Sequence, residues 1–291
     1  MTEVLCIGSV LWDIIGRHDR DMIAGNDRPG HITRLPGGVA LNVAMTLRRF
    51  DLAPVLLSAV GTDPEGNELA RACAVMGMDT QHLFRPDDLP TDRYMAIEGA
   101  NGLIAAIADA HSLEAAGDAI LAPLHDGRLG SAATPYTGTI VLDGNLTKTL
   151  LEQIADDPAF AAADLRLAPA SPGKAGRLLP LLHHPKATIY VNLEEAGLLC
   201  NQTLPDAPSA AQTLRDKGAT RVLVTNGAHA AAFATDNQIL SALPPKVRQA
   251  RVTGAGDTFM AAHIAAERAG AAPQTSLQDG LAAAAHYVSV L

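Results

Sequence analysis

The sequence is poor in cysteine and has no long apolar run. Its three cysteines, Cys6, Cys73 and Cys200, are scattered, odd in number and surrounded by apolar residues, which favours buried thiols in a reducing cytosol over a disulfide framework. The first residues do not resemble a signal peptide, and no apolar stretch is long enough to span a bilayer. We therefore expect a soluble, cytoplasmic protein with no membrane partner.

Positive charge is also scarce. The chain has 22 lysines and arginines against 31 aspartates and glutamates, a formal net charge of −9. A nucleic-acid-binding surface normally carries a basic stripe, so this balance argues against nucleic acid as a partner. Phosphate binding stays compatible with an acidic chain, because local backbone amides and a metal ion can hold the phosphate.

Aromatic residues make up only 3% of the chain, whereas 48% of its residues are apolar, chiefly Ala, Leu and Val. Short apolar runs typical of buried strands alternate with segments typical of helices. This alternation predicts an α/β fold with a doubly wound, mostly parallel sheet and helices on both faces. The length of 291 residues allows one large domain or two smaller ones. The predicted strands are residues 4–7, 55–60, 139–142, 165–168, 188–191 and 222–225; the predicted helices are residues 40–50, 64–76, 147–154, 173–182, 194–199, 209–217 and 259–269.

Two segments do not follow this alternation. Residues 14–35 are polar and irregular, and residues 93–97 and 103–108 flank a Gly-Ala-Asn-Gly sequence at 99–102. Apolar runs on either side of such a turn are typical of a β-hairpin. Both segments are therefore set apart from the main sheet.

The stretch most indicative of chemistry is TGAGDTF at residues 253–259. Small residues let the backbone N–H groups of Gly254, Ala255 and Gly256 point outward at a helix N-terminus, where the helix dipole favours an anion. Asp257 would be repelled by a ground-state phosphate, but it suits a base that takes a proton from a hydroxyl while the amides hold phosphoryl oxygens. The stretch therefore indicates a kinase; the alternative is a glycine-rich turn whose Asp only compensates the dipole.

A second glycine motif, PGGVALNVA at residues 36–44, lies far upstream. The two motifs, in this order, resemble the two signatures of the ribokinase-like (PfkB) carbohydrate and nucleoside kinases, and the resemblance extends over essentially the whole chain. It implies a single ribokinase-like kinase domain over residues 1–291, with ATP and magnesium as cofactors. It also implies a small β-sheet lid made of residues 14–35 and 91–109. Because unpaired edge strands tend to be covered by a partner chain, we expect a homodimer joined through the lids.

The resemblance implies a sugar site. Asp13 matches the family's sugar-binding Asp, whose carboxylate accepts from two vicinal hydroxyls at once; an ordinary turn residue is the alternative. Gly38 lets the backbone lie against a sugar, and Asn42 is a polar contact in a helical segment that otherwise disfavours Asn. The GTDPEG sequence at residues 61–66 also recurs in the family, but we interpret it as a turn and helix start with Pro64 near the first helical position.

The nucleotide end of the site is assigned in the same way. Asn192 and Glu195 match the family's N-x-x-E element, in which the Glu organises the magnesium–nucleotide complex. One such carboxylate is enough for a cation that keeps most of its waters. Thr225 and Gly227 resemble the family's nucleotide-binding T-x-G. The expected nucleotide-binding residues are Asn192, Thr225, Gly227, Gly254 and Gly256.

Two positions near this end depart from the family pattern. Ala230 stands where the family usually has a second glycine, and its methyl group would narrow the nucleotide approach. Arg251 stands where members commonly have an acidic residue that helps form a monovalent-cation site. Its guanidinium would either replace the electrostatic effect of potassium or point to solvent, so potassium dependence is doubtful.

Three further segments resemble the pseudouridine kinase branch of the family: residues 103–109, DGNL at 143–146, and APASPGKA at 168–175, where Ala168 replaces the usual Asp. Pseudouridine exposes one more ring N–H than uridine, so a site that reads its base needs extra acceptors. Asp27, in a polar patch, would accept from that N–H, and Lys174 would donate to a uracil carbonyl. For both, an ordinary solvated residue is an equal alternative.

The function implied is transfer of a phosphoryl group from ATP to the 5′-hydroxyl of pseudouridine. Two alternatives stay open. One is another ribokinase-like sugar or nucleoside kinase. The other is a catalytically weak nucleoside-binding sensor, suggested by Ala168, Ala230 and Arg251 but opposed by Asp257, since a pure binder has no need of a base.

Overall fold

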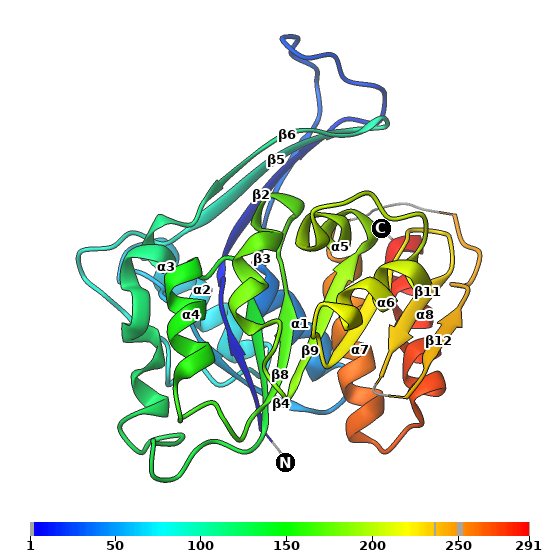
Figure 1. Ribbon diagram of the computed structural model, residues 1–291. Coiled ribbons are helices and arrows are strands. Elements are labelled where there is room, and N and C mark those ends of the chain that lie inside the picture. The colour runs from blue at the N-terminus through cyan, green and yellow to red at the C-terminus, as the bar shows by residue number, and fades with distance from the viewer. Residues whose placement is uncertain (1–2, 236, 249–252, 291) are drawn as a thin grey trace.

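The computed structural model describes residues 3–235, 237–248 and 253–290. An eight-stranded sheet forms the centre of the molecule, with strand order β12-β11-β10-β9-β8-β7-β1-β4. A second sheet of four strands, in the order β3-β2-β5-β6, projects away from it (Figure 1).

The main sheet is parallel except at one edge. The strands from β4 to β10 pair in parallel, whereas β11 and β12 are antiparallel additions. This arrangement agrees with the short, mostly apolar sequences of its inner strands, which are buried on both faces. The strands are β1 (Glu3–Ile7), β4 (Ala53–Leu57), β7 (Thr139–Asp143), β8 (Asp164–Ala168), β9 (Ala187–Asn192), β10 (Arg221–Thr225), β11 (Ala231–Ala234) and β12 (Ile239–Ala242).

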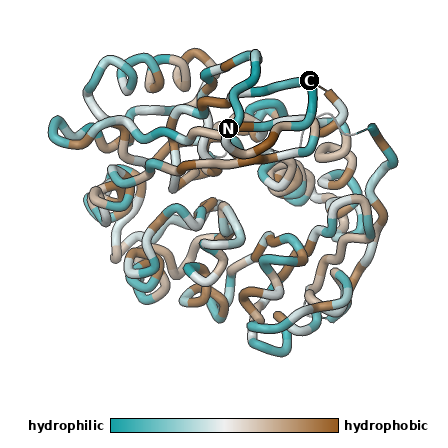
Figure 2. Tube along the Cα trace, turned by 90° about the horizontal axis from the view of Figure 1, so that it is seen from above, coloured by the Kyte–Doolittle hydropathy of each residue, from teal (hydrophilic) through white to brown (hydrophobic). Residues whose placement is uncertain are grey.

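Helices cover both faces of this sheet. One apolar core packs six helical elements on one face, and a second core packs α1, α2, α7 and α8 on the other. In Figure 2 the hydrophilic stretches lie mainly in the outer turns. The first set is α3 (His111–Ala116), η1 (Gly117–Leu124), α4 (Lys148–Asp156), η2 (Pro172–Leu181), α5 (Leu193–Cys200) and α6 (Ala207–Asp216); the second is α1 (Val39–Arg48), α2 (Pro64–Val75), α7 (Ala255–Arg268) and α8 (Pro273–Ser289).

The predicted α/β fold with a doubly wound, mostly parallel sheet is confirmed. From β1 the sheet extends in one direction to β4 and in the other to β7, β8, β9 and β10. The strand order therefore reverses between β1 and β7. In such sheets the crevice outside the carboxyl ends of the strands, at the reversal point, is where ligands bind.

The second sheet is built from the two segments that did not follow the alternation. Its strands are β2 (Leu11–Arg17), β3 (His31–Gly37), β5 (Arg93–Gly99) and β6 (Gly102–Asp109). Near its base the Trp12 indole donates to the Glu65 carbonyl at the start of α2, at 3.0 Å. Arg93 forms an ion pair with the Glu65 carboxylate at 2.8 Å. These contacts fix the root of the second sheet to the main body.

Two sequence predictions about local structure are corrected. Residues 173–182 were expected to form an α-helix but form the 3₁₀ helix η2. Pro180 has no N–H for an α-helical hydrogen bond, and Gly173 and Gly176 are poor helix formers. Residues 14–35 are not irregular throughout, because strands β2 and β3 enclose an exposed loop at residues 18–30.

The structural interpretation of residues 61–66 is confirmed. Asp63 caps α2 by accepting a hydrogen bond from the Gly66 N–H at 2.7 Å, with Pro64 at the first helical position. Its carboxylate also accepts from Thr91 N and Oγ1, and these bonds lower the pKa of Asp63. In the part of the chain that the structure describes, no helix combines the length and the apolar character that crossing a membrane would need.

Candidate active site

A cavity of about 670 Å³ lies at the carboxyl ends of five parallel strands of the main sheet. Its wall includes Ser9 after β1, Asn145 after β7, Ala168 at the end of β8, Asn192 at the end of β9 and Thr225 at the end of β10. The second sheet contributes another part of the wall, from β2, β5 and β6. The volume is in the range of ligand sites, and the position is the strand-order reversal.

Most of the site residues predicted from the sequence meet at this cavity. They come from segments far apart in the chain. Those that line it are Asp13, Gly38, Asn42, Lys174, Asn192, Glu195, Thr225, Gly227, Gly254, Ala255, Gly256 and Asp257. Asp27 does not join them, because it lies in the exposed loop between β2 and β3.

Asp257 lies in the first turn of α7, on the cavity wall. The Asn42 side-chain amide, from α1, donates to its Oδ2 at 2.9 Å. Burial raises the pKa of Asp257 to about 7, and the carboxylates of Asp143, Asp13 and Glu195 raise it further, against the effect of the Asn42 bond. A carboxylate with a pKa near neutrality is a competent general base.

The turn before Asp257 has the geometry of an anion site. Gly254 is the N-cap of α7 with φ 89°, and a Cβ there would lie 2.6 Å from the Tyr287 hydroxyl. At Gly256, by contrast, a Cβ would meet none of the surrounding atoms of the described residues within 4 Å. Packing therefore requires glycine at 254, and the described part of the chain shows no such crowding at 256. N–H groups in the first turn of a helix have no intrahelical acceptor and can bind an anion.

Asp13, on β2, lines the cavity beside Tyr94 of β5, with which it is in register. Burial raises the pKa of Asp13 to about 6. Gly37 leaves room for this carboxylate, because a Cβ at position 37 would lie 2.0 Å from Asp13 Oδ2. The first glycine of the motif thus makes room for a protein side chain instead of for a ligand.

A buried network connects Lys174 to the start of α1. Lys174 Nζ donates to Asn145 Oδ1, and Asn145 Nδ2 donates to Ser9 Oγ at 2.8 Å. The Ser9 hydroxyl donates to Asp143 Oδ2 at 2.8 Å and accepts from Val39 N at 2.8 Å. Burial and the nearby Arg177 lower the pKa of Lys174. Lys174 is therefore held in the cavity wall by a chain of fixed partners.

The carboxylate at the centre of this network, Asp143, is fully buried. Burial raises the pKa of Asp143, while bonds from Ser9, Asn145 and Ala40 act against this effect. Gly38 belongs to the same arrangement: it has φ 97°, and a Cβ there would lie 2.4 Å from the Ser9 carbonyl. Position 38 therefore requires glycine, because the chain there lies close to the segment that contains Ser9.

Asn192 and Glu195 form a capping box at the start of α5. Asn192 Oδ1 accepts from Glu195 N at 2.9 Å, and Glu195 Oε2 accepts from Asn192 N at 2.8 Å. This pairing explains the N-x-x-E spacing by helix capping alone. Burial raises the pKa of Glu195, and the nearby Glu194 raises it further. Both residues nevertheless line the cavity, so a second role remains compatible with the cap.

Of the two positions that depart from the family pattern, Ala230 and Arg251, the structure describes only Ala230. Ala230 follows the turn after β10 and does not line the cavity, whereas Thr225 and Gly227 do. Arg251 lies outside the described residues. In the rest of the chain, no group of three or more His, Cys, Asp or Glu side chains is placed to hold a metal.

Several residues of the site, including Ser9, Tyr94, Asp143 and Asn145, were not assigned from the sequence. Ser9 and Asp143 are 134 positions apart, and no local sequence pattern indicates that they form a hydrogen bond. Tyr94 could have been found from strand alternation, because it shares the cavity face of the second sheet with Asp13 and Ala108.

Fold and site together define an enzyme that transfers a phosphoryl group to a hydroxyl group. Residues 1–290 match the pfkB family of carbohydrate kinases, and the chain belongs to this family. Membership of a kinase family implies ATP as the phosphoryl donor.

Known relatives are distant. The chain is 27% identical to the pseudouridine kinase of Escherichia coli (strain K12) over 263 residues, 89% of this chain and 81% of that protein. It is also 27% identical to the pseudouridine kinase of Arabidopsis thaliana, over 104 residues, 36% of this chain and only 27% of that protein. A solved carbohydrate kinase from Agrobacterium tumefaciens has a TM-score of 0.80 at 26% identity, covering 98% of this chain and 90% of that one.

The raised pKa values predict the pH dependence of the reaction. Both roles expected from the sequence, a base at Asp257 and an acceptor of two hydroxyl hydrogen bonds at Asp13, would require the ionised carboxylate. We expect log kcat/KM for the acceptor to rise with pH, most steeply below about pH 6, and to level off above about pH 7. Initial rates between pH 5 and pH 9 measure this profile, and a flat profile would contradict it. In Asp13→Asn only the break near pH 7 should remain.

Proposed function

We propose that the protein phosphorylates the 5′-hydroxyl of pseudouridine, with ATP as donor and magnesium as cofactor. The observation that carries the choice of acceptor is the position of Lys174, which Asn145 holds in a cavity wall whose other ionisable groups are mostly carboxylates. A fixed cationic donor suits a base that presents carbonyl oxygens. Similarity to two pseudouridine kinases supports the same choice.

The chemical step follows from the residues around Asp257. The carboxylate of Asp13 holds the ribose hydroxyls, so that the 5′-hydroxyl points to Asp257. Asp257 takes the proton of that hydroxyl as the hydroxyl oxygen attacks the γ-phosphorus of ATP. The bond between this phosphorus and the β,γ-bridging oxygen breaks, and ADP leaves. The N–H groups of Gly254, Ala255 and Gly256 stabilise the charge on the transferring group. Thr225, Gly227 and Asn192 contact the rest of the nucleotide.

Magnesium would neutralise charge on the triphosphate. Glu195 is the residue that would hold it, directly or through water. Its Oε2 accepts the capping bond from Asn192, Glu195 lines the cavity, and burial raises the pKa of its carboxyl group. A nearby cation would favour the ionised form. Potassium is not part of the proposal.

Selectivity for the base is assigned to Lys174 and not to Asp27, which lies in the exposed loop. We expect Lys174→Ala to lower kcat/KM for pseudouridine more than for ribose, because ribose has no base to contact. A hydrogen bond from a charged donor is worth about 1.5–3 kcal/mol, which corresponds to roughly 10- to 100-fold. Kinetics with both acceptors measure the difference. Lys148→Ala, on the exposed helix α4, is the matched control; an equal loss for both acceptors would refute the role of Lys174.

We also propose that the second sheet is a lid that excludes water from the cavity, and that two protomers join through it. Ile32, Met95, Ile97 and Ile107 lie on the face of this sheet opposite Asp13, as the strand registers require. All four are exposed, Ile32 at 79% and Ile107 at 69%. We call these four residues the outer apolar face. An apolar sheet face bordered by open edge strands suits a second copy of the same face.

A charge on the outer apolar face should separate the protomers. We expect wild type at micromolar concentration to have about twice the 30.2 kDa chain mass by light scattering, and Ile107→Glu to be monomeric. Val75→Glu is the matched control, because Val75 is 82% exposed on α2, away from the second sheet. A monomeric wild type would contradict the dimer.

We also propose that the reaction takes place in the cytoplasm. Cys6, Cys73 and Cys200 are all buried and free, a state that a reducing compartment preserves.

A further inference from the structure

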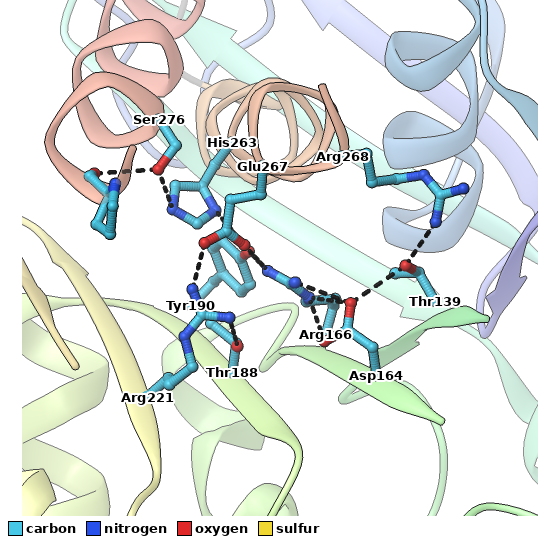
Figure 3. Close-up of polar contacts among 11 residues, drawn as sticks. Thr139, Asp164, Arg166, Thr188, Tyr190, Arg221, His263, Glu267, Arg268 and Ser276 are labelled. Atoms are coloured by element: carbon cyan, nitrogen blue, oxygen red, sulfur yellow. Dashed lines mark hydrogen bonds and ion pairs between the residues drawn. The ribbon is translucent and has the colours of Figure 1, made fainter. Parts of the chain in front are cut away.

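A buried polar network lies on the main sheet beneath α7 (Figure 3). Arg166 of β8 binds both oxygens of Asp164 and also donates to Glu267 near the end of α7. Arg221 of β10 donates to the other oxygen of Glu267. Two cations therefore face two carboxylates. Arg166, at the centre of this group, is almost wholly shielded from water.

A chain of neutral groups continues this network to α8. Arg166 donates to the Tyr190 hydroxyl at 2.9 Å, and that hydroxyl is 2.9 Å from His263 Nδ1. His263 Nε2 is 3.3 Å from Ser276 Oγ, which donates to the Pro273 carbonyl at 3.0 Å. Burial lowers the pKa of His263 to about 3, so the ring is neutral.

The partners determine the direction of these bonds. Ser276 donates its only hydroxyl proton to the Pro273 carbonyl, so it accepts from His263 Nε2. The neutral ring then has no proton on Nδ1 and accepts there from the Tyr190 hydroxyl, which itself accepts from Arg166. Each group from Arg166 to Ser276 therefore has one role, and the chain has one consistent orientation.

The network ends close to the proposed catalytic groups. Tyr190 and Phe259 both line the cavity, and their rings meet edge to face at 6.4 Å. Two residues of α7, His263 and Glu267, are held by the network, while Asp257 lies in the first turn of the same helix. Since an α-helix is a stiff unit with a rise of about 1.5 Å per residue, a shift at His263 would move Asp257.

We propose that Tyr190, His263 and Glu267 are positioning residues, which hold α7 at the one place on the sheet where Asp257 and its neighbouring amides face the acceptor and the phosphate. A buried ionic network is a poor source of stability, because an apolar replacement is often as stable. Directional bonds to three strands and to α8 instead fix the position of α7. The proposal rests on the proposed function, since the groups that it positions are those of the kinase reaction.

Tyr190→Phe is the variant that tests the proposal, because it removes only the hydroxyl between Arg166 and His263. We expect kcat to fall about 10-fold with little change in KM, since small displacements of reacting groups are costly. Asp257 should also become better hydrated, which lowers its pKa. Its charged neighbours Asp143, Asp13 and Glu195 stay in place. The acid side of the pH profile should therefore move to lower pH. Ser276→Ala, at the far end of the chain, should show the same changes more weakly.

Ile154→Val is the control for a purely structural effect. Ile154 is buried on α4, on the opposite face of the main sheet, so this variant should lose stability without a change in kcat or in the pH profile. A Tyr190→Phe enzyme with wild-type kcat and an unmoved profile would overturn the proposal, and Ser276→Ala gives the same test should Tyr190→Phe not fold.

Amide hydrogen exchange provides a readout that does not need turnover. Each variant is measured at a temperature the same number of degrees below its own Tm. Amide exchange in residues 258–262 of α7 should then be faster in Tyr190→Phe than in Ile154→Val. Unchanged exchange there would refute the positioning role. Absence of ADP formation by the wild type would instead refute the proposed function, so the two failures are distinguishable.

Discussion

Asp257→Asn should lower kcat by at least about 100-fold while substrate binding is retained. Asn keeps the shape of the side chain and the contact with Asn42 of α1 but cannot accept the hydroxyl proton, and removing a general base costs about 100- to 10,000-fold. Coupled ADP release measures kcat, and calorimetric titration with the acceptor shows that binding survives. Turnover near the wild-type rate would contradict the assignment of Asp257 as the base.

The same variant should be more stable than wild type in alkaline solution. Burial raises the pKa of Asp257 to about 7, so the native state holds a proton that the unfolded state releases between about pH 4 and pH 7. Stability of the wild type therefore falls as pH rises through this window. Asp257→Asn escapes this loss, and its Tm should exceed that of the wild type by several degrees at pH 8 but not at pH 4. Equal Tm differences at the two pH values would show that Asp257 is not a strained buried acid.

Asp13→Asn should lower kcat/KM for the acceptor by about 100-fold and leave KM for ATP unchanged. The ionised carboxylate accepts from two hydroxyls, and each hydrogen bond to a charged group is worth about 1.5–3 kcal/mol. The nucleotide is assigned to residues after β9 and β10, on strands that do not touch β2. Steady-state kinetics with each substrate varied in turn separate the two effects.

Gly37→Ala provides an independent test of the same site. Its methyl group would be placed 2.0 Å from Asp13 Oδ2, so the carboxylate must move and acceptor kinetics should fall in the same way. Gly176→Ala is the matched control, because a Cβ there meets no atom within 4 Å. Normal acceptor kinetics in Gly37→Ala would show that the position of Asp13 is not critical.

The sequence was sufficient to predict the fold and to select candidate site residues that mostly lie on the cavity wall, for one physical reason. The chemistry-bearing residues follow buried strands, and parallel strands bring their carboxyl ends to one edge of the sheet. Asn192 at the end of β9 and Thr225 at the end of β10 could therefore be placed together without knowledge of their contacts. Alternation of apolar segments was enough to predict helices on both faces.

Contacts between segments far apart in the chain could not be predicted from the sequence. The bond from Asn42 to Asp257 joins residues 215 positions apart, and it depends on how α1 packs beside α7. Asp27 was assigned from its place in a polar patch, but the length of the loop between β2 and β3 carries it away from the cavity. Nor did the sequence indicate that packing requires glycine at 38, where a Cβ would lie 2.4 Å from the carbonyl of the distant Ser9.

Coupled ADP release with magnesium–ATP and, in turn, pseudouridine, uridine and ribose tests the central claim most directly. The account predicts phosphoryl transfer to pseudouridine with the highest kcat/KM of the three, because it assigns recognition of the base to Lys174, which Asn145 holds in the cavity wall. Equal kcat/KM for pseudouridine and uridine would contradict the substrate assignment within the kinase family, and no acceptor-dependent ADP with pseudouridine would contradict the proposed function as a whole.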